Sequence, residues 1–221
     1  MIEVSDLVKS YSVGGQVFKA VDGVSVTIHK GEMVSIVGHS GSGKTTLLSL
    51  LGGLTKPDSG NIIIDKNNIL QMTDDTLSEF RNIKIGFIYQ FASLVPTLTA
   101  AQNIVLPALF SAERKINGKS AEDLLRIVGL QDKADAYPSQ LSGGQQRRIA
   151  IARAFANSPE LVLADEPTGD LDEETEAEMI EFFSSINREK GVTFVVVTHN
   201  SELARRFGRQ LRMQNGMLLN L

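Results

Sequence analysis

The chain of 221 residues is long enough for one sizeable α/β domain, and its 42% hydrophobic and 22% charged content is that of an ordinary globular protein. The net charge of −4 gives no electrostatic reason to expect nucleic acid, and the absence of cysteine excludes disulfides and thiolate metal sites. No basic-then-apolar leader opens the sequence, and no apolar run approaches the ~20 residues that span a bilayer. We therefore expect a soluble chain, which a partner would have to hold at any membrane.

The N-terminal part of the chain predicts strands that alternate with short helices. Alternating or continuous apolar runs predict strands at Ile2–Tyr11, Val24–Ile28, Met33–Val37, Asn61–Ile64 and Lys84–Tyr89. The first two alternate apolar and polar residues, which is typical of half-buried antiparallel strands. A helix is predicted to start near Gly43, and another follows Thr73 or Asp74 as its N-cap.

The central part of the chain, between Phe91 and Pro159, shows no strand signal and predicts a mostly helical lobe. Beyond it, strand and helix signals resume and end in an Asn-Gly hairpin within RMQNGMLLNL. The order of strands and helices favours a parallel sheet covered on both faces. The predicted helices are Ala101–Phe110, Lys119–Val128, Gly143–Ala156 and Glu173–Lys190, and the predicted strands are Leu161–Ala164 and Thr193–Thr198.

The segment GHSGSGKT, which starts at Gly38, fits the phosphate-binding pattern G-x-x-x-x-G-K-[ST] in full. Its glycines let backbone N–H groups turn toward an anionic oxygen, and the following helix N-terminus adds partial positive charge. Lys44 can reach the β- and γ-phosphates, and the Thr45 hydroxyl can ligate Mg²⁺. A chance glycine-rich turn is the alternative, but the flanking strand and helix favour a phosphate site. The residues expected there are Gly38, His39, Ser40, Gly41, Ser42, Gly43, Lys44, Thr45 and Thr46, with His39 exposed.

Two acidic residues, Asp165 and Glu166, follow the apolar run Leu161–Ala164. In open parallel sheets, ligands gather outside the carboxyl ends of the strands. Asp165 would then hold Mg²⁺, directly or through water, and Glu166 could polarise an attacking water. Such a pair alone would more often cap a helix. The phosphate loop reverses that preference.

A second glycine-rich segment, LSGGQ, precedes the predicted helix that begins at Gly143. The phosphate loop and Asp165 already enclose a nucleotide, so another such helix start would be redundant within one molecule. It makes sense if it faces a γ-phosphate held by another molecule. The alternative is a simple N-cap formed by Ser142.

Together these motifs give the sequence a clear resemblance to the ATP-binding subunits of ABC transporters, over nearly the whole chain. GHSGSGKT resembles their Walker A motif, LSGGQ their signature and LVLADE their Walker B. GDLD, from Gly169 to Asp172, resembles the D-loop, and Gln90 resembles the Q-loop glutamine. His199 in VVTHN resembles the switch histidine, and Tyr11 resembles the aromatic residue that stacks on adenine. The shared order of these motifs is far more specific than any one of them.

The resemblance implies ATP and Mg²⁺ as ligands and a head-to-tail dimer. Catalysis would depend on Lys44, Gln90, Glu166 and His199, and Mg²⁺ would be held by Thr45, Gln90 and Asp165. Each nucleotide would lie between the phosphate loop of one chain and the signature residues of the other. Those residues are Ser142, Gly143, Gly144 and Gln145, and Asp172 would line the site as well. Tyr11 would stack on adenine; a core or edge-strand aromatic is the alternative.

The family fold implies an α/β P-loop NTPase core with a mostly parallel sheet, an N-terminal antiparallel β subdomain and an inserted helical subdomain. The whole chain, 1–221, would form one ABC ATPase domain. Its core would comprise 1–90 and 158–221, and the helical subdomain, 91–157, would carry the signature. The sequence is similar to ATPases of the macrolide-export and lipoprotein-release group in three segments, LLGGLTKPDSG, SLVPTLTAAQNIVLP and ADEPTGDLD. At the position of Asp170 in the D-loop, that group more often has Asn.

The partners implied are a second copy of the chain and an integral membrane (permease) subunit on a separate chain. No nucleic acid is expected, and the chain would be cytoplasmic, held peripherally at the inner face of the cell membrane by that subunit. One alternative is a mechanical role on a membrane partner, as in the cell-division relatives. Another is a soluble DNA- or ribosome-acting ABC ATPase, although its usual coiled-coil insertions, zinc modules or tandem halves do not fit here. A P-loop kinase or GTPase would explain neither LSGGQ nor His199.

Overall fold

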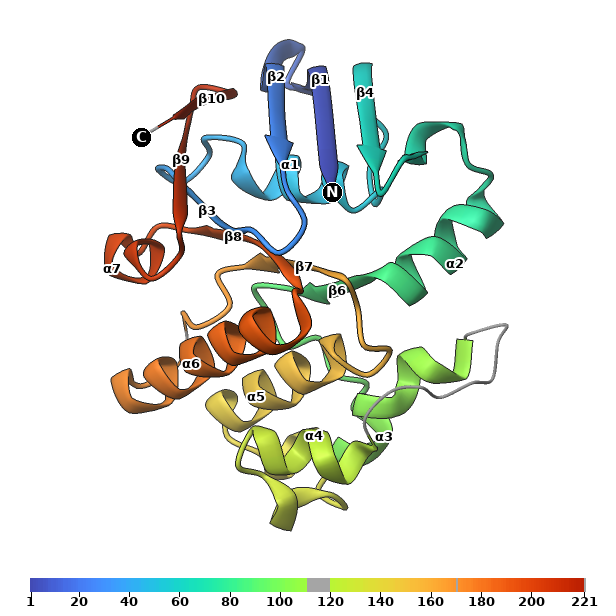
Figure 1. Ribbon diagram of the computed structural model, residues 1–221, viewed down its shortest axis with the longest axis vertical. Coiled ribbons are helices and arrows are strands. Elements are labelled where there is room, and N and C mark those ends of the chain that lie inside the picture. Colours follow the sequence, from blue (N-terminus) through green and yellow to red (C-terminus); the bar gives the residue numbers. More distant parts are fainter. Residues whose placement is uncertain (111–119, 170, 221) are drawn as a thin grey trace. The chain divides into compact units, whose positions relative to one another are not determined.

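The computed structural model describes residues 1–110, 120–169 and 171–220 (Figure 1). These residues form two compact units. Unit 1 comprises Met1–Leu77 and Thr193–Leu221, and unit 2 comprises Ser78–Val192. Lys119, the expected first residue of one helix, and Asp170 of the D-loop lie outside the described residues.

Unit 1 contains an antiparallel sheet at the N-terminus, as the alternating pattern predicts. Ile2 pairs with Ile28 on one side and with Ile64 on the other, and all three side chains are fully buried. The second strand begins at Gln16 rather than at Val24, because a Gly14–Gly15 turn with positive φ at both residues folds the chain back at once. The strands, in the order β2-β1-β4-β5, are β1 (Ile2–Val13), β2 (Gln16–Ile28), β4 (Ser59–Ile64) and β5 (Asn67–Asn68).

Unit 1 also contains a group of parallel strands, one of which leads into the phosphate loop. β3 (Met33–Val37) runs parallel to both β8 (Thr193–Thr198) and β9 (Arg209–Gln214). Every residue of β8 is buried, as expected for a strand that is covered on both faces. The predicted Asn-Gly hairpin is confirmed, since β10 (Met217–Asn220) turns back onto β9 through two positive-φ residues. The helices here are α1 (Lys44–Leu51), the 3-10 helix η1 (Ile69–Gln71) and α7 (Ser201–Arg205).

Helix α2 (Asp74–Lys84) begins in unit 1 and ends in unit 2. Its predicted cap is confirmed, because the Thr73 hydroxyl accepts a hydrogen bond from the Thr76 amide at 3.3 Å. The remaining elements of unit 2 are the parallel strands β6 (Ile85–Ile88) and β7 (Leu161–Asp165), the α-helices α3 (Ala100–Val105), α4 (Ala121–Ile127), α5 (Gly143–Ala154) and α6 (Glu173–Lys190), and the 3-10 helices η2 (Leu106–Phe110), η3 (Gln131–Lys133) and η4 (Pro138–Gln140).

The helix predicted at 101–110 is α-helical only as far as Val105. It continues as the 3-10 helix η2, because Pro107 has no backbone N–H to donate to the preceding turn. Between Phe91 and Pro159 the described residues form no strand, as expected. Among the described helices, none combines the length and the apolar character needed to cross a membrane.

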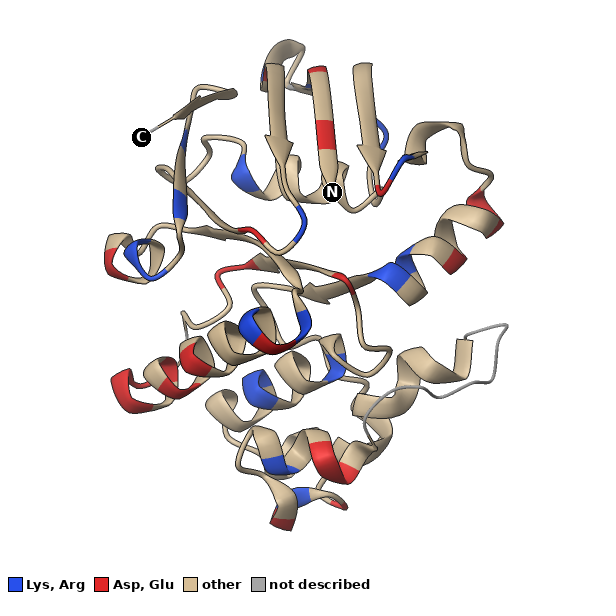
Figure 2. Ribbon diagram, viewed as in Figure 1, with Lys and Arg blue, Asp and Glu red and all other residues tan. Residues whose placement is uncertain are grey.

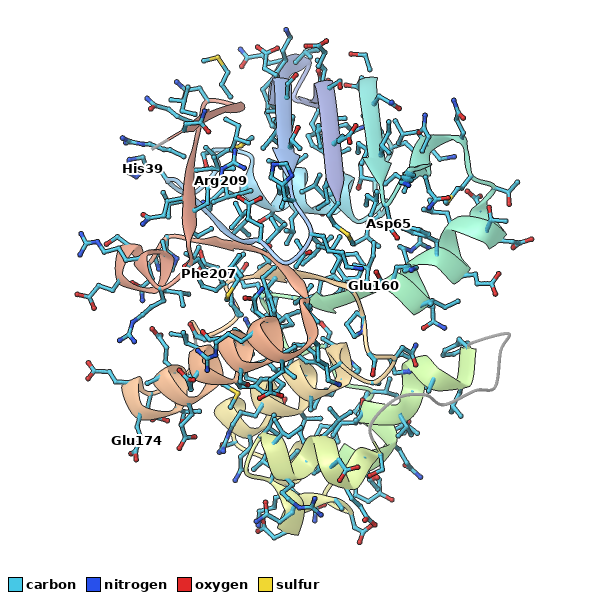
Figure 3. The ribbon with its side chains drawn as sticks, viewed as in Figure 1. His39, Asp65, Glu160, Glu174, Phe207 and Arg209 are labelled. Carbon is cyan, nitrogen blue, oxygen red and sulfur yellow. The ribbon has the colours of Figure 1, made fainter. Side chains whose placement is uncertain are left out.

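Charge and capping explain why α6 occupies its predicted range. Figure 2 shows acidic positions at the start of the helix. The negative charges of Glu173 and Glu174 stabilise the helix there, because they lie at the positive end of its dipole. Glu174 points outward from the helix (Figure 3). Lys190 lies in the last turn, and Gly191 ends the helix in the left-handed conformation at φ 65°.

Candidate functional site

The phosphate loop connects β3 to α1 and requires glycine at Gly43. This residue has φ 106°, and a Cβ there would collide with the backbone carbonyl of Ala20. The loop is closed from within by a 3.2 Å hydrogen bond from the Ser42 amide to the His39 carbonyl. The Ser42 hydroxyl is buried and has no hydrogen-bond partner among the described residues. Such a donor can bind an oxygen-rich ligand at the loop.

Lys44 is the first residue of α1 and is largely buried. Its ammonium donates to the carbonyl oxygens of Gly38 at 2.8 Å and His39 at 3.0 Å. These bonds hold the positive charge at the loop. His39 itself is exposed, as expected (Figure 3).

An open pocket of about 510 Å³ lies against the first half of the phosphate loop. Its lining includes Val37, Gly38, His39 and Ser40 of the loop side, together with His199 and Arg212. The strand register explains why His199 and Arg212 lie beside the loop, since Val37 pairs with Thr198 on β8 and with Arg212 on β9. His199, which follows Thr198, therefore leaves its strand beside the loop.

Tyr11 lies on β1 in the antiparallel sheet, with 38% of its surface exposed. Its ring packs against Phe18 on β2, with the ring centroids 5.8 Å apart, and the Lys9 ammonium lies 5.7 Å from the Tyr11 centroid. Tyr11 is therefore not a core residue. Part of the residue remains accessible to solvent, between these two neighbours.

Of the two acidic residues in unit 2, Asp165 is the last residue of β7 and Glu166 follows it. Asp165 is buried at the strand end, and Glu166 has the left-handed φ of 46°. Because β6 and β7 run in parallel with Ile88 opposite Ala164, Gln90 and Glu166 leave neighbouring strands at the same edge. Gln90 is exposed.

The second glycine-rich segment forms the N-terminus of α5. The Ser142 hydroxyl accepts from the Gln145 amide at 3.2 Å, and the Gln145 side chain accepts from the Ser142 amide at 2.9 Å. The N-cap interpretation of Ser142 is therefore confirmed. Ser142 and Gly143 are nevertheless exposed, and a Cβ at Gly143 would meet no atom within 4 Å. Capping thus leaves this helix start open to a ligand from outside.

The sequence profile of the family described as ABC transporter matches residues 21–169. The chain belongs to this family. It is an ATP-binding ATP hydrolase of the ABC type.

Two solved structures of the ATP-binding cassette MJ0796, described as a bacterial ABC transporter cassette, share this fold. One, a dimer in a post-hydrolysis state bound to ADP and Pi, superposes with a TM-score of 0.92 at 39% identity, covering 99% of this chain and 96% of that one. The other, also dimeric, gives 0.93 at 40% identity with the same coverage. The expected α/β P-loop fold, with parallel strands, an N-terminal antiparallel sheet and helices, is confirmed.

The residues of this ABC ATPase fit a nucleotide with its magnesium ion. Mg²⁺ prefers hard oxygen ligands and is held in proteins by one or two carboxylates together with substrate phosphates. Unit 1 offers such an oxygen at the exposed residue Thr45, and unit 2, taken by itself, offers one at the buried carboxylate of Asp165. Within the described ranges, no three His, Cys, Asp or Glu side chains cluster as a metal site on their own. The ion would therefore depend on phosphate oxygens.

Unit 1 brings the phosphate loop and His199 together, and unit 2 brings Gln90 and the acidic pair to one strand edge. Tyr11 does not line the loop pocket. Asp172 is exposed and caps α6, since its carboxylate accepts from the Thr175 amide at 2.9 Å and the Thr175 hydroxyl at 2.8 Å. These bonds hold the pKa of Asp172 below its usual value.

Two arginines that lie beside these residues, Arg147 and Arg212, are not among the site residues predicted from the sequence. Arg212 lines the loop pocket, and only its pairing on β9 places it there. Arg147 is buried in unit 2 and donates to the carbonyl of Tyr89, which precedes Gln90, and to that of Glu166. A signal for Arg147 exists in the sequence, because it shares one helical stripe with Ala150, Ile151 and Ala154.

Proposed function

We propose that the protein hydrolyses MgATP at two sites, each formed head to tail between two copies of the chain. Each nucleotide would lie between the loop Gly38–Thr46 of one copy and the signature residues Ser142–Gln145 of the other. The observation that carries this proposal is the presence of two glycine-rich helix starts, on α1 and α5. Only the first holds a lysine at its phosphate loop, whereas the second begins with the exposed residues Ser142 and Gly143. The dimeric state of the similar cassettes supports it.

In the chemical step, Glu166 is the general base. Its carboxylate takes a proton from water as the water oxygen attacks the γ-phosphorus, and the bond to the β–γ bridging oxygen breaks to release ADP and phosphate. Lys44 stabilises the charge that builds on the β- and γ-phosphate oxygens. His199 hydrogen-bonds the γ-phosphate and orients the water, which its place beside the loop supports.

Gln90, Thr45 and Asp165 would hold a magnesium ion, which would neutralise phosphate charge when bound. Gln90 also senses the γ-phosphate, and Tyr11 stacks on adenine. The remaining contacts are assigned to the loop residues Gly38, His39, Ser40, Gly41, Ser42, Gly43 and Thr46, and to Asp172. The exposed ring of Tyr11 and the exposed amide of Gln90 support these roles, because a core side chain could not reach a ligand.

Hydrolysis would drive a separate membrane subunit that docks on the helical part of unit 2. Large apolar side chains are exposed there at Phe91 (74%), Leu109 (72%) and Phe110 (74%). Contiguous apolar patches are typical of a partner surface, and the proposal assigns these three side chains to one such patch. Phe91 directly follows Gln90, so a docked partner would respond to the group that senses the γ-phosphate.

The domain division belongs to the same proposal, with a core of 1–90 and 158–221 and a helical subdomain of 91–157. We place the chain in the macrolide-export and lipoprotein-release branch, as an exporter or extractor ATPase at the inner face of the cell membrane. The similarity of LLGGLTKPDSG and ADEPTGDLD to that group supports the placement.

A pull-down tests the proposal. Tagged Glu166→Gln protein would be expressed in its native host, and membranes would be solubilised gently with MgATP present. A co-purifying polytopic membrane protein is expected, and its loss in Phe91→Ser Phe110→Ser protein would map the docking surface. Recovery of an ATP-bound dimer without any membrane protein would favour an ABC ATPase that acts without a membrane partner.

A further inference from the structure

We propose that Arg147 is a positioning residue that fixes the backbone at Gln90 and at Glu166 to the signature helix α5. The inference rests on the proposed roles of Gln90 and Glu166 in hydrolysis. It adds a buried residue that acts through both of these groups.

The Arg147 side chain is 1% exposed, although guanidinium groups are costly to bury. It donates from Nε to the Pro167 carbonyl at 2.8 Å and from Nη2 to the carbonyls of Asp165, at 3.3 Å, and Glu166. From Nη1 it donates to the Tyr89 carbonyl. Its bonds therefore reach the backbone on two separate segments.

The planar guanidinium sets the distance between those two segments. Its donors diverge in a rigid fork, so one edge can bond the segment after β7 while another bonds the end of the β6 segment. A lysine ammonium would offer a single nitrogen on a flexible stem. It could keep the charge without keeping the spacing.

The first segment is the turn that carries the proposed general base. Glu166 adopts φ 46°, a conformation that non-glycine residues seldom adopt. The three successive carbonyls that Arg147 bonds belong to this turn. Arg147 therefore restrains the backbone conformation that aims the Glu166 side chain.

The second segment carries Gln90, and α5 holds it on both sides. Arg147 bonds the carbonyl of Tyr89, and Arg153, further along α5, bonds the carbonyls of Ala92 at 2.8 Å and Ser93 at 2.9 Å. Gln90 lies between these anchored points. A displacement of α5, whose first residues form the signature, is thereby passed to Gln90 and Glu166 together.

The test measures turnover against binding in Arg147→Lys and Arg147→Gln. We expect kcat for ATP to fall by about 10²-fold, the usual effect of a small misplacement of reacting groups, while KM and the affinity for a fluorescent ATP analogue stay within about threefold. Compared with Arg147→Gln, Arg147→Lys should restore more of the thermal stability than of kcat. Val128→Ala, a buried apolar truncation in unit 2, is the control for a general loss of stability and should retain kcat.

Hydrogen exchange supplies a second readout, in which Arg147→Lys should speed exchange at both 90–93 and 166–168. If neither Arg147 variant folds, Arg153→Gln carries the test and should lower kcat and speed exchange at 92–95 alone. Unchanged kcat in the folded variants, or a kcat loss equal to that of Val128→Ala at equal stability loss, would overturn the inference. Normal turnover in Glu166→Gln would instead overturn the proposed catalytic assignment on which it rests.

Discussion

The ammonium of Lys44 donates a hydrogen bond to the carbonyl oxygen of Gly38 at 2.8 Å, so the first residue of α1 is tied to the first residue of the phosphate loop. Removing this group by Lys44→Ala takes away the charge that the loop offers to the β- and γ-phosphates. We expect the affinity for ATP to fall roughly 10- to 100-fold, which corresponds to one charge-assisted hydrogen bond. Titration with a fluorescent ATP analogue measures it, with Lys190→Ala at the exposed end of α6 as the control. Equal affinity in both variants would contradict the role.

Glu166→Gln keeps the size of the side chain but removes its basicity. ATP turnover should slow by about 10²- to 10⁴-fold while ATP binding is retained, since general-base catalysis contributes that much to rate. A phosphate-release assay gives the rate, and Glu189→Gln on the exposed end of α6 is the matched neutralisation. The Glu166→Gln protein should also accumulate as an ATP-bound dimer, because ligand binding favours the dimer by mass action. A monomeric mass by light scattering at saturating MgATP would count against the head-to-tail site.

Unit 2 has two serine N-caps, Ser120 and Ser142, and a comparison of their alanine variants distinguishes capping from ligand binding. Ser120 accepts from the Asp123 amide at 3.1 Å and Ser142 from the Gln145 amide at 3.2 Å, so the two caps are alike in geometry. Ser120→Ala and Ser142→Ala should each lower stability by about 1 kcal/mol. Only Ser142→Ala should weaken ATP-driven dimerisation, measured in the Glu166→Gln background. Equal dimerisation in the two variants would leave Ser142 as a cap alone.

The cap of α6 predicts a pH dependence of stability. Hydrogen bonds from the Thr175 amide and then from the Thr175 hydroxyl lower the pKa of Asp172, so its stabilising effect is complete above its unfolded pKa of about 3.9 and is lost as the pH falls through the lower folded value. Asp172→Asn should therefore be less stable than the parent at pH 7 and equally stable below that range. Thermal unfolding at both pH values tests this. The same pattern in Glu178→Gln, a neutralisation on the same helix, would refute the assignment to Asp172.

The sequence alone determined the features that depend on consecutive residues. The phosphate loop, the range of α6 and the Asn-Gly hairpin were all predicted, because φ-permissive glycines, N-caps and hydrophobic periods act over a few residues. The tight Gly14–Gly15 turn, which extends β2 to Gln16, could have been read from the same local signals.

The tertiary structure alone decided which distant residues meet. His199 and Arg212 reach the phosphate loop only because β8 and β9 pair with β3 in a register that the sequence does not display. The sequence does not mark Arg147 as a buried charge, because a charged residue on a helix is usually solvated. Its burial is stable only where carbonyls from two other segments converge on its donors. Such long-range compensation of a buried charge arises from the packed chain, not from any local stretch of it.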